Sequence, residues 1–258
     1  PAPFPAPYVQ STLTSGNVLS GQVTNPITAN LTAEFTLNEG NGTSTRDISG
    51  NGYAGTFAAG GNAPSWGTWG VQFSNPGCVG VTATWVQTTV KTYFTALVYA
   101  CISLSFGTNG TATGGLPVAA FPALFGTPAN TDSVSLIAGA TANNLTSQND
   151  GAWQPAAFAP GFSTSNWKTR ALAPIPSPCG VVALSLDTND HIYFNGVEVA
   201  YSEQGAASAY VTTATTGYQI GDHNNASGEA FKGTIGYVVF YSTVLTPAQI
   251  AQETKYIR

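Results

Sequence analysis

Charged side chains are scarce in this chain, at 7% of 258 residues, whereas ordinary soluble domains carry about 25%. So little charge would suit a disordered chain or a membrane protein. Disorder is excluded because 43% of the residues are hydrophobic and 11% are aromatic, enough to bury a core. A membrane span is not expected, because no apolar run approaches the roughly 20 residues of a spanning helix. The surface must therefore be built from neutral polar residues, a composition that suits a rigid protein exposed to the outside better than a cytoplasmic enzyme.

Positive charge is rarer still, with seven Lys and Arg and a net charge of −5. These cations are scattered along the chain, and phosphate binding needs clustered cations, so we expect no nucleic-acid partner. Methionine is absent. Residue 1 is therefore not a translational start, and we expect a trimmed chain or a fragment.

Cysteine is limited to three residues, Cys78, Cys101 and Cys179. No C-x-x-C spacing occurs, which argues against a zinc site. An odd number allows at most one internal bridge. Two readings stay open: buried free thiols, or a bridge between Cys101 and Cys179, each of which adjoins a strongly apolar segment.

The stretch IYFNGVEV, residues 192–199, carries the clearest local signal. Asn-Gly between alternating segments predicts a type I′ hairpin, since that turn needs positive φ at both central residues. Closing it pairs Phe194 with Val197 and Tyr193 with Glu198. Ile192, Phe194, Val197 and Val199 then share a dry face, and the opposite face is expected to be wet.

Short alternating segments separated by Gly, Pro, Asn and Asp continue along the chain, so we expect an all-β sandwich. Residues 1–30 begin Pro-rich and predict an extended arm or linker, and residues 31–258 form the domain. Irregular inserts are expected at 107–133 and 141–178. A single helix is predicted over 245–256, with Thr246 as N-cap and a capping box closed by Gln249.

The ordered motifs NEGNG, RDISGNGYAG, WGVQF, VVALSLD, IYFNGVEV, YQIGD and FKGTIGYVVFYSTVLTPAQI resemble the laminin-G-like, concanavalin-A-like jelly-roll family. The resemblance covers roughly residues 31–258 and is most specific in the C-terminal third. It implies two antiparallel sheets packed face to face, loops at the rims, and a binding or adhesive role. The two inserts depart from the compact family pattern.

Family members often hold Ca²⁺ at a rim, which suits oxygen-rich loops. The resemblance places Asp47 and Asn51 in one such loop, and the GDHNNASGE loop offers Asp222 and Glu229. Solvated turn residues are the alternative reading. Gly236 stands where the family often has Asp, which weakens the prediction.

Glycan binding requires exposed aromatic rings beside amides or carboxylates. Trp153 with Gln154, and Trp167 with Asn166, fit best because they lie outside confident strands. Packing inside the inserts is the alternative for both. The other three tryptophans, Trp66, Trp69 and Trp85, alternate with core-type residues and are expected to be packed.

Catalysis is not expected. The twelve acids never form the E-x-D-x-x-E spacing of related glucanases, and Asp187 with Asp190 suits a turn. His191 is expected to be a solvated strand residue, and the chain lacks a G-x-S-x-G elbow.

Two functions follow as hypotheses. One is a non-catalytic carbohydrate-binding or adhesive module, outside the cell or on a particle surface. The other is a structural subunit of a virion or surface filament that assembles, as a homo-oligomer or on neighbouring subunits, through residues 1–30.

Overall fold

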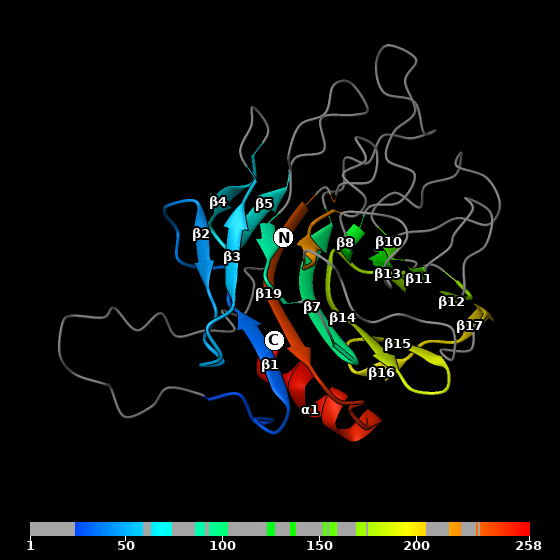
Figure 1. The fold of residues 1–258 in the computed structure, drawn as a ribbon. Coiled ribbons are helices and arrows are strands. Elements are labelled where there is room, and N and C mark those ends of the chain that lie inside the picture. The colour runs from blue at the N-terminus through cyan, green and yellow to red at the C-terminus, as the bar shows by residue number, and fades with distance from the viewer. Residues whose placement is uncertain are drawn as a thin grey trace, which may run out of the picture.

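The computed structural model describes residues 24–58, 63–73, 86–90, 93–102, 123–126, 135–137, 152–153, 155–158, 169–173, 175–204, 217–222, 231 and 233–258. Within them the chain forms two antiparallel sheets packed as a sandwich, with one C-terminal helix (Figure 1). The predicted all-β sandwich is confirmed. No helix in this part of the chain is long and apolar enough to cross a membrane.

The first sheet has the order β16-β15-β14-β7-β19-β5-β4, and β1 pairs with β19 beyond the end of β5. Its strands are β1 (Leu31–Phe35), β4 (Ser65–Gly67), β5 (Gly70–Phe73), β7 (Thr95–Ile102), β14 (Cys179–Leu186), β15 (Asp190–Phe194), β16 (Val197–Glu198) and β19 (Gly233–Tyr241).

The second sheet has the order β17-β12-β11-β9-β8-β18-β6-β3-β2. Its strands are β2 (Ser44–Arg46), β3 (Ala54–Phe57), β6 (Val86–Thr88), β8 (Ala123–Gly126), β9 (Ser135–Ile137), β11 (Ala156–Phe158), β12 (Thr169–Ala171), β17 (Tyr201–Glu203) and β18 (Gln219–Ile220); a separate pair joins β10 (Ala152–Trp153) to β13 (Ile175–Pro176).

The predicted inserts are less irregular than the composition indicates. Strand β8 lies inside 107–133, and β10, β11, β12 and β13 lie inside 141–178. These strands are two to four residues long. Such short segments show no readable alternation, and it is pairing with neighbouring strands that makes them strands.

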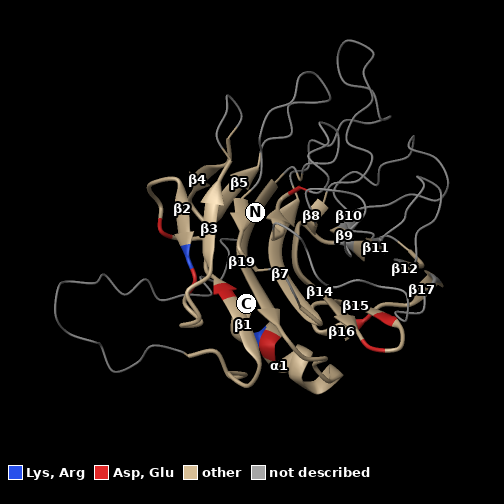
Figure 2. Cartoon of the chain, viewed as in Figure 1, with Lys and Arg blue, Asp and Glu red and all other residues tan. Residues whose placement is uncertain are grey.

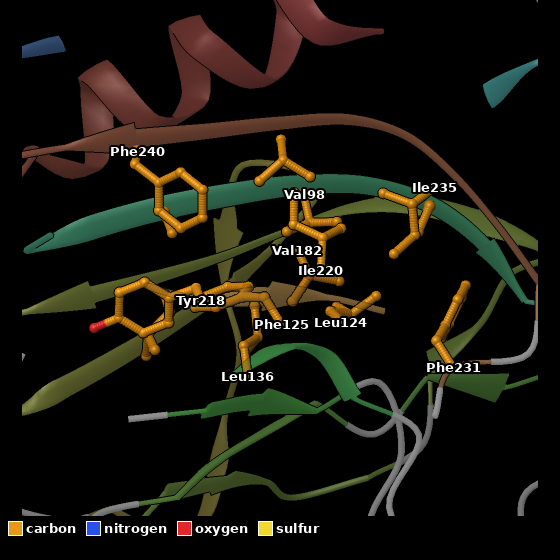
Figure 3. Packing of buried hydrophobic residues seen from close by; sticks show 14 of the residues in the cluster. Val98, Leu124, Phe125, Leu136, Val182, Tyr218, Ile220, Phe231, Ile235 and Phe240 are labelled. Carbon is orange, nitrogen blue, oxygen red and sulfur yellow. The ribbon is translucent and has the colours of Figure 1, made fainter. Parts of the chain in front are cut away.

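The main core lies between the two sheets. Figure 3 shows Val98, Val182 and Phe240 of the first sheet pointing toward Phe125 and other side chains of the second. Phe125 meets Phe240 edge to face, with ring centroids 5.6 Å apart. Both side chains are fully buried, so aromatic packing joins the layers.

A second apolar cluster lies on the other face of the first sheet, where helix α1 (Pro247–Ile257) packs (Figures 1 and 3). Ile250 and Ile257 of the helix share this cluster with Val239 of β19. The helix begins as predicted: the Thr246 hydroxyl accepts from the Gln249 amide at 3.3 Å in a capping box. This face is therefore largely dry, and the prediction of one wet face was wrong for the part under α1.

The hairpin is confirmed in turn and register. Asn195 and Gly196 have φ of 53° and 80°, and the pairs are Phe194 with Val197 and Tyr193 with Glu198. The exposure of two of its side chains was predicted wrongly. Tyr193 is only 3% exposed, and Val197 is 70% exposed, because α1 covers the outer face while β16 ends at the sheet edge.

The cysteine question is answered for one pair. Cys101 and Cys179 are directly opposite on β7 and β14 and form a disulfide. Neighbouring cross-strand positions bring Cβ atoms within bonding reach. Cys78 lies outside the described residues.

Candidate uncharged binding face

A row of outward side chains crosses the first sheet at the end that α1 does not reach. Register pairs Ser65 with Gln72, Gln72 with Thr234, Thr234 with Cys101, and Cys101 with Cys179. Their strand neighbours Val71, Phe73, Ile102 and Ile235 belong to the inter-sheet core. Because side chains alternate along a strand, the row faces outward.

An aromatic corner adjoins this row at the turn between β4 and β5. Trp69 is 46% exposed, which corrects the prediction that it is packed. The Gln72 side chain lies over Gly67, at the base of the same turn. Trp66 points inward instead: its ring lies 4.9 Å from that of Phe57, and its Nε1 donates to the Gly42 carbonyl at 2.8 Å.

Glycines bring the turn close to β19. Gly70 has φ of 147°, and a Cβ atom there would collide with the Ile235 carbonyl oxygen. A Cβ on Gly236 would lie 2.8 Å from the Trp69 carbonyl oxygen and 3.3 Å from the Tyr99 ring. The Trp69 backbone and the Tyr99 ring therefore flank a stretch of bare backbone at Gly236. We call Ser65, Trp69, Gln72, Tyr99 and Thr234 the open face.

The open face carries no charge. Strands β4, β5, β7, β14 and β19 contain no Asp, Glu, Lys or Arg, and Figure 2 shows them without coloured segments. Tyr99 is half-buried at the boundary with the helix, where burial raises its pKa while the charge of Arg258 lowers it. An indole ring beside amide and hydroxyl groups can stack on a flat apolar surface and hydrogen-bond its edges.

Two acids meet under α1, at the other end of the same outer face. Glu34 of β1 and Glu253 of α1 are 2% and 0% exposed. The Asn25 amide nitrogen donates to Glu253 Oε1 at 3.0 Å and to Glu34 Oε2 at 3.4 Å. Tyr237 and Tyr241 of β19 complete the group, which we call the acid bridge: Tyr237 donates to Glu34, and Asn25 donates to the Tyr241 hydroxyl at 3.0 Å.

The hairpin holds a third titratable group. His191 Nδ1 lies 2.6 Å from Glu198 Oε1, and His191 Nε2 lies 3.2 Å from Asp187 Oδ1. Burial lowers the pKa of His191, but the hydrogen bond to Glu198 and the charge of Asp187 together raise it by more, so the pKa lies above its ordinary value. His191 is therefore a partly exposed residue of β15, as predicted, whose two ring nitrogens both have acidic partners.

Asp47, one of the predicted calcium ligands, braces its own loop. Its Oδ1 accepts from the amides of Glu34 and Ser49, each at 2.9 Å, and its Oδ2 accepts from the Ser49 hydroxyl at 2.8 Å and the Tyr53 amide at 3.1 Å. The Asn51 amide nitrogen donates to the Leu31 carbonyl at 2.7 Å. Four donors therefore hold the Asp47 carboxylate within its own loop.

Most of the remaining predicted site residues lie outside the part of the chain that the structure describes. Asp222 is 2% exposed, and Glu229, Gln154, Asn166 and Trp167 lie outside the described residues. Trp153 lies in β10, where its backbone pairs with Ile175. Among the described residues no group of three or more His, Cys, Asp or Glu is placed to hold a metal. The calcium and Trp153/Trp167 sites stay predictions.

No family model and no curated protein matches the sequence. The structure is similar to domain 4 of AbnA, an extracellular GH43 arabinanase from Geobacillus stearothermophilus, in complex with arabinotriose: TM-score 0.57, 20% identity, covering 87% of this chain and 98% of that one. It is similar to Trypanosoma rangeli sialidase, with TM-score 0.55 and 16% identity, covering 89% of this chain and 33% of that one.

A third similar structure is the binding domain of Paraclostridial Mosquitocidal Protein 1: TM-score 0.50, 10% identity, covering 88% of this chain and 52% of that one. At these identities the likeness shows the fold alone, a concanavalin-like jelly roll.

Proposed function

We propose that the protein is a non-catalytic module that binds neutral carbohydrate through its open face. The observation that carries the proposal is Trp69, 46% exposed, on a face whose strands hold no charged residue. Sugar rings present flat apolar patches that stack on an indole, and their hydroxyls pair with amides and hydroxyls such as those of Gln72 and Thr234.

The comparisons support the same class of function. A similar domain belongs to an extracellular arabinanase and was solved with arabinotriose. A further similar domain is the binding domain of Paraclostridial Mosquitocidal Protein 1. Binding is favoured over hydrolysis because Glu34 and Glu253 are 2% and 0% exposed and offer no approach to a substrate. Asp187 and Glu198, the surface acids of the hairpin, both contact His191.

An extracellular location belongs to this proposal. The Cys101–Cys179 disulfide supports it, since such bonds persist mainly in oxidising compartments. The structural-subunit hypothesis depends on residues 1–30, of which 1–23 lie outside the described residues, and it stays a prediction.

The test is a titration of neutral and sialylated oligosaccharides, with arabinotriose among the neutral probes. We expect neutral chains to bind, and Trp69→Ala to weaken binding by at least about tenfold, a loss typical of a truncated Trp anchor. Leu172→Ala is the matched control, because Leu172 is 59% exposed but lies at the end of β12, away from the open face. Equal affinity of Trp69→Ala and the parent protein would remove the open face as the site.

A further inference from the structure

The chain before β1 is attached to the domain at two side chains. In residues 24–30, Asn25 and Ile27 are buried, at 7% and 6% exposure, and their neighbours are exposed. Ile27 joins the cluster under α1. Asn25 donates to both buried acids and shapes its own segment, since its Oδ1 accepts from the Ile27 amide at 2.7 Å. Asn25 therefore couples this segment to β1 and α1.

The acids around Asn25 lack a compensating cation. Glu253 faces Glu34 of β1, Tyr237 and Tyr241 of β19, and Asn25, whereas no Lys or Arg of the described residues forms an ion pair with either acid. Tyr256 of α1 also donates to Glu34, at 3.2 Å. Glu253 Oε2 has no hydrogen-bond partner in the described part of the chain. A second negative charge here would be buried and unpaired.

The protonation of Glu253 decides which state the acid bridge tolerates. Burial raises its pKa from 4.5 to about 8; hydrogen bonds from Tyr241 and Asn25 oppose the rise, and the charge of Glu34 adds to it. Burial also raises the pKa values of Tyr237 and Tyr241 above their usual 10. Glu253 therefore changes its charge near pH 8, well below the two tyrosines.

We propose that the acid bridge is a pH-sensitive latch, which holds residues 24–28 on the first sheet while Glu253 carries its proton and weakens that hold once Glu253 ionises. This inference goes beyond carbohydrate binding and does not depend on it. The sign follows from linkage: the pKa of Glu253 is raised to about 8 in the docked state, so release that lets water reach the carboxyl is opposed at acidic pH, and this stabilisation is lost as the pH rises through about 8.

The segment, not the helix, is the part that yields. Helix α1 is fixed by Ile250 and Ile257 in the apolar cluster and by its capping box. Strand β1 is fixed by its pairing with β19. Residues 24–28 have one buried apolar side chain, Ile27, and the hydrogen bonds of Asn25. The Asn25 hydrogen bond favours the ionised carboxyl, so what loosens the segment is the cost of keeping an anion buried, which is relieved when residues 24–28 leave and water reaches Glu253.

Methyl NMR of isoleucine-labelled protein tests this latch. The docked-to-released ratio of Ile27 is expected to fall by up to about tenfold per pH unit between pH 5 and 8 and to level off above. Glu253→Gln keeps the shape of a protonated carboxyl and should remove the pH dependence. Glu39→Gln makes the same change outside the acid bridge and should behave like the parent protein.

Two further signals separate the alternatives. Asn25→Ala should release Ile27 at every pH, a result that stands even if Glu253→Gln fails to fold. Ile250 on α1 should keep its buried shift throughout, and movement of Ile250 together with Ile27 would mean that the helix opens, which overturns the assignment. An Ile27 signal that stays docked at every pH up to 9, or an unchanged pH dependence in Glu253→Gln, also overturns the proposal.

Discussion

The disulfide offers a prediction whose size follows from topology. Cys101 and Cys179 are 78 residues apart, so the bond closes a long loop in the unfolded chain. In the loop-entropy model a ring of this length stabilises the fold by about 4.5 kcal/mol. Replacing both residues by serine in a Cys78→Ser background should lower the free energy of unfolding by that amount or somewhat less, because unfolded chains are more compact than the model assumes.

The fold itself should survive the change. Strands β7 and β14 remain paired from Gly180–Ala100 to Ser185–Thr95, and the core side chains between the sheets are untouched. The native state keeps its packing, and the change acts mainly on the unfolded ensemble. We therefore expect an unaltered circular dichroism spectrum with a shifted transition.

Urea unfolding followed by tryptophan fluorescence measures the effect. With a slope near 3 kcal/mol per molar, the midpoint should fall by about 1.5 M. Adding reductant supplies an internal control, because the Cys78→Ser reference and the triple variant should then unfold at the same midpoint. Equal midpoints without reductant would show that the bond is absent or that the entropy argument does not hold here.

Two further predictions concern backbone and charge. Gly70→Ala should lower the free energy of unfolding, measured by thermal denaturation, by at least about 2 kcal/mol, since φ is 147° and the new Cβ collides with the Ile235 carbonyl. Gly40→Ala, at φ of 74° with open space around the new Cβ, should lower it by about 1 kcal/mol. An equal loss in the two variants would refute the collision argument. The His191 imidazole should titrate above 6.5 by NMR, and Glu198→Gln should lower that midpoint. The His191 pair then stabilises the fold below pH 6.5, by less than about 1 kcal/mol, and loses this contribution as pH rises.

Local rules explain what the sequence predicts well. Asn195-Gly196 needs only its own two positive φ values to set the hairpin, and Thr246 needs only Gln249 to cap the helix. Both signals lie within a few residues. Strand β8 is different, because it becomes a strand only by pairing with β9 on one side and with the distant β18 on the other.

The acid bridge left a weaker trace in the sequence. Glu253 stands three residues after Ile250 and four before Ile257, on the apolar stripe of the helix. An acid in that position indicates burial. Nothing local indicates its partner, since Glu34 and Glu253 are separated in sequence by most of the chain. Trp69 was misassigned for a related reason: it sits in a tight turn, where alternation no longer reports which side faces the core.

Strand β19 joins the two proposed functions and also separates them. Its outward residues divide at Gly236, with Thr234 on the open face and Tyr237 and Tyr241 in the acid bridge. The inward residues of the same strand, Ile235, Val238 and Phe240, are buried in the inter-sheet core. Because these buried side chains hold β19 in place, we expect the position of Thr234 to stay unchanged when residues 24–28 are released. Because the open face has no group that titrates near neutral pH, carbohydrate affinity and docking of Ile27 should respond independently to pH, and each proposal can fail without the other.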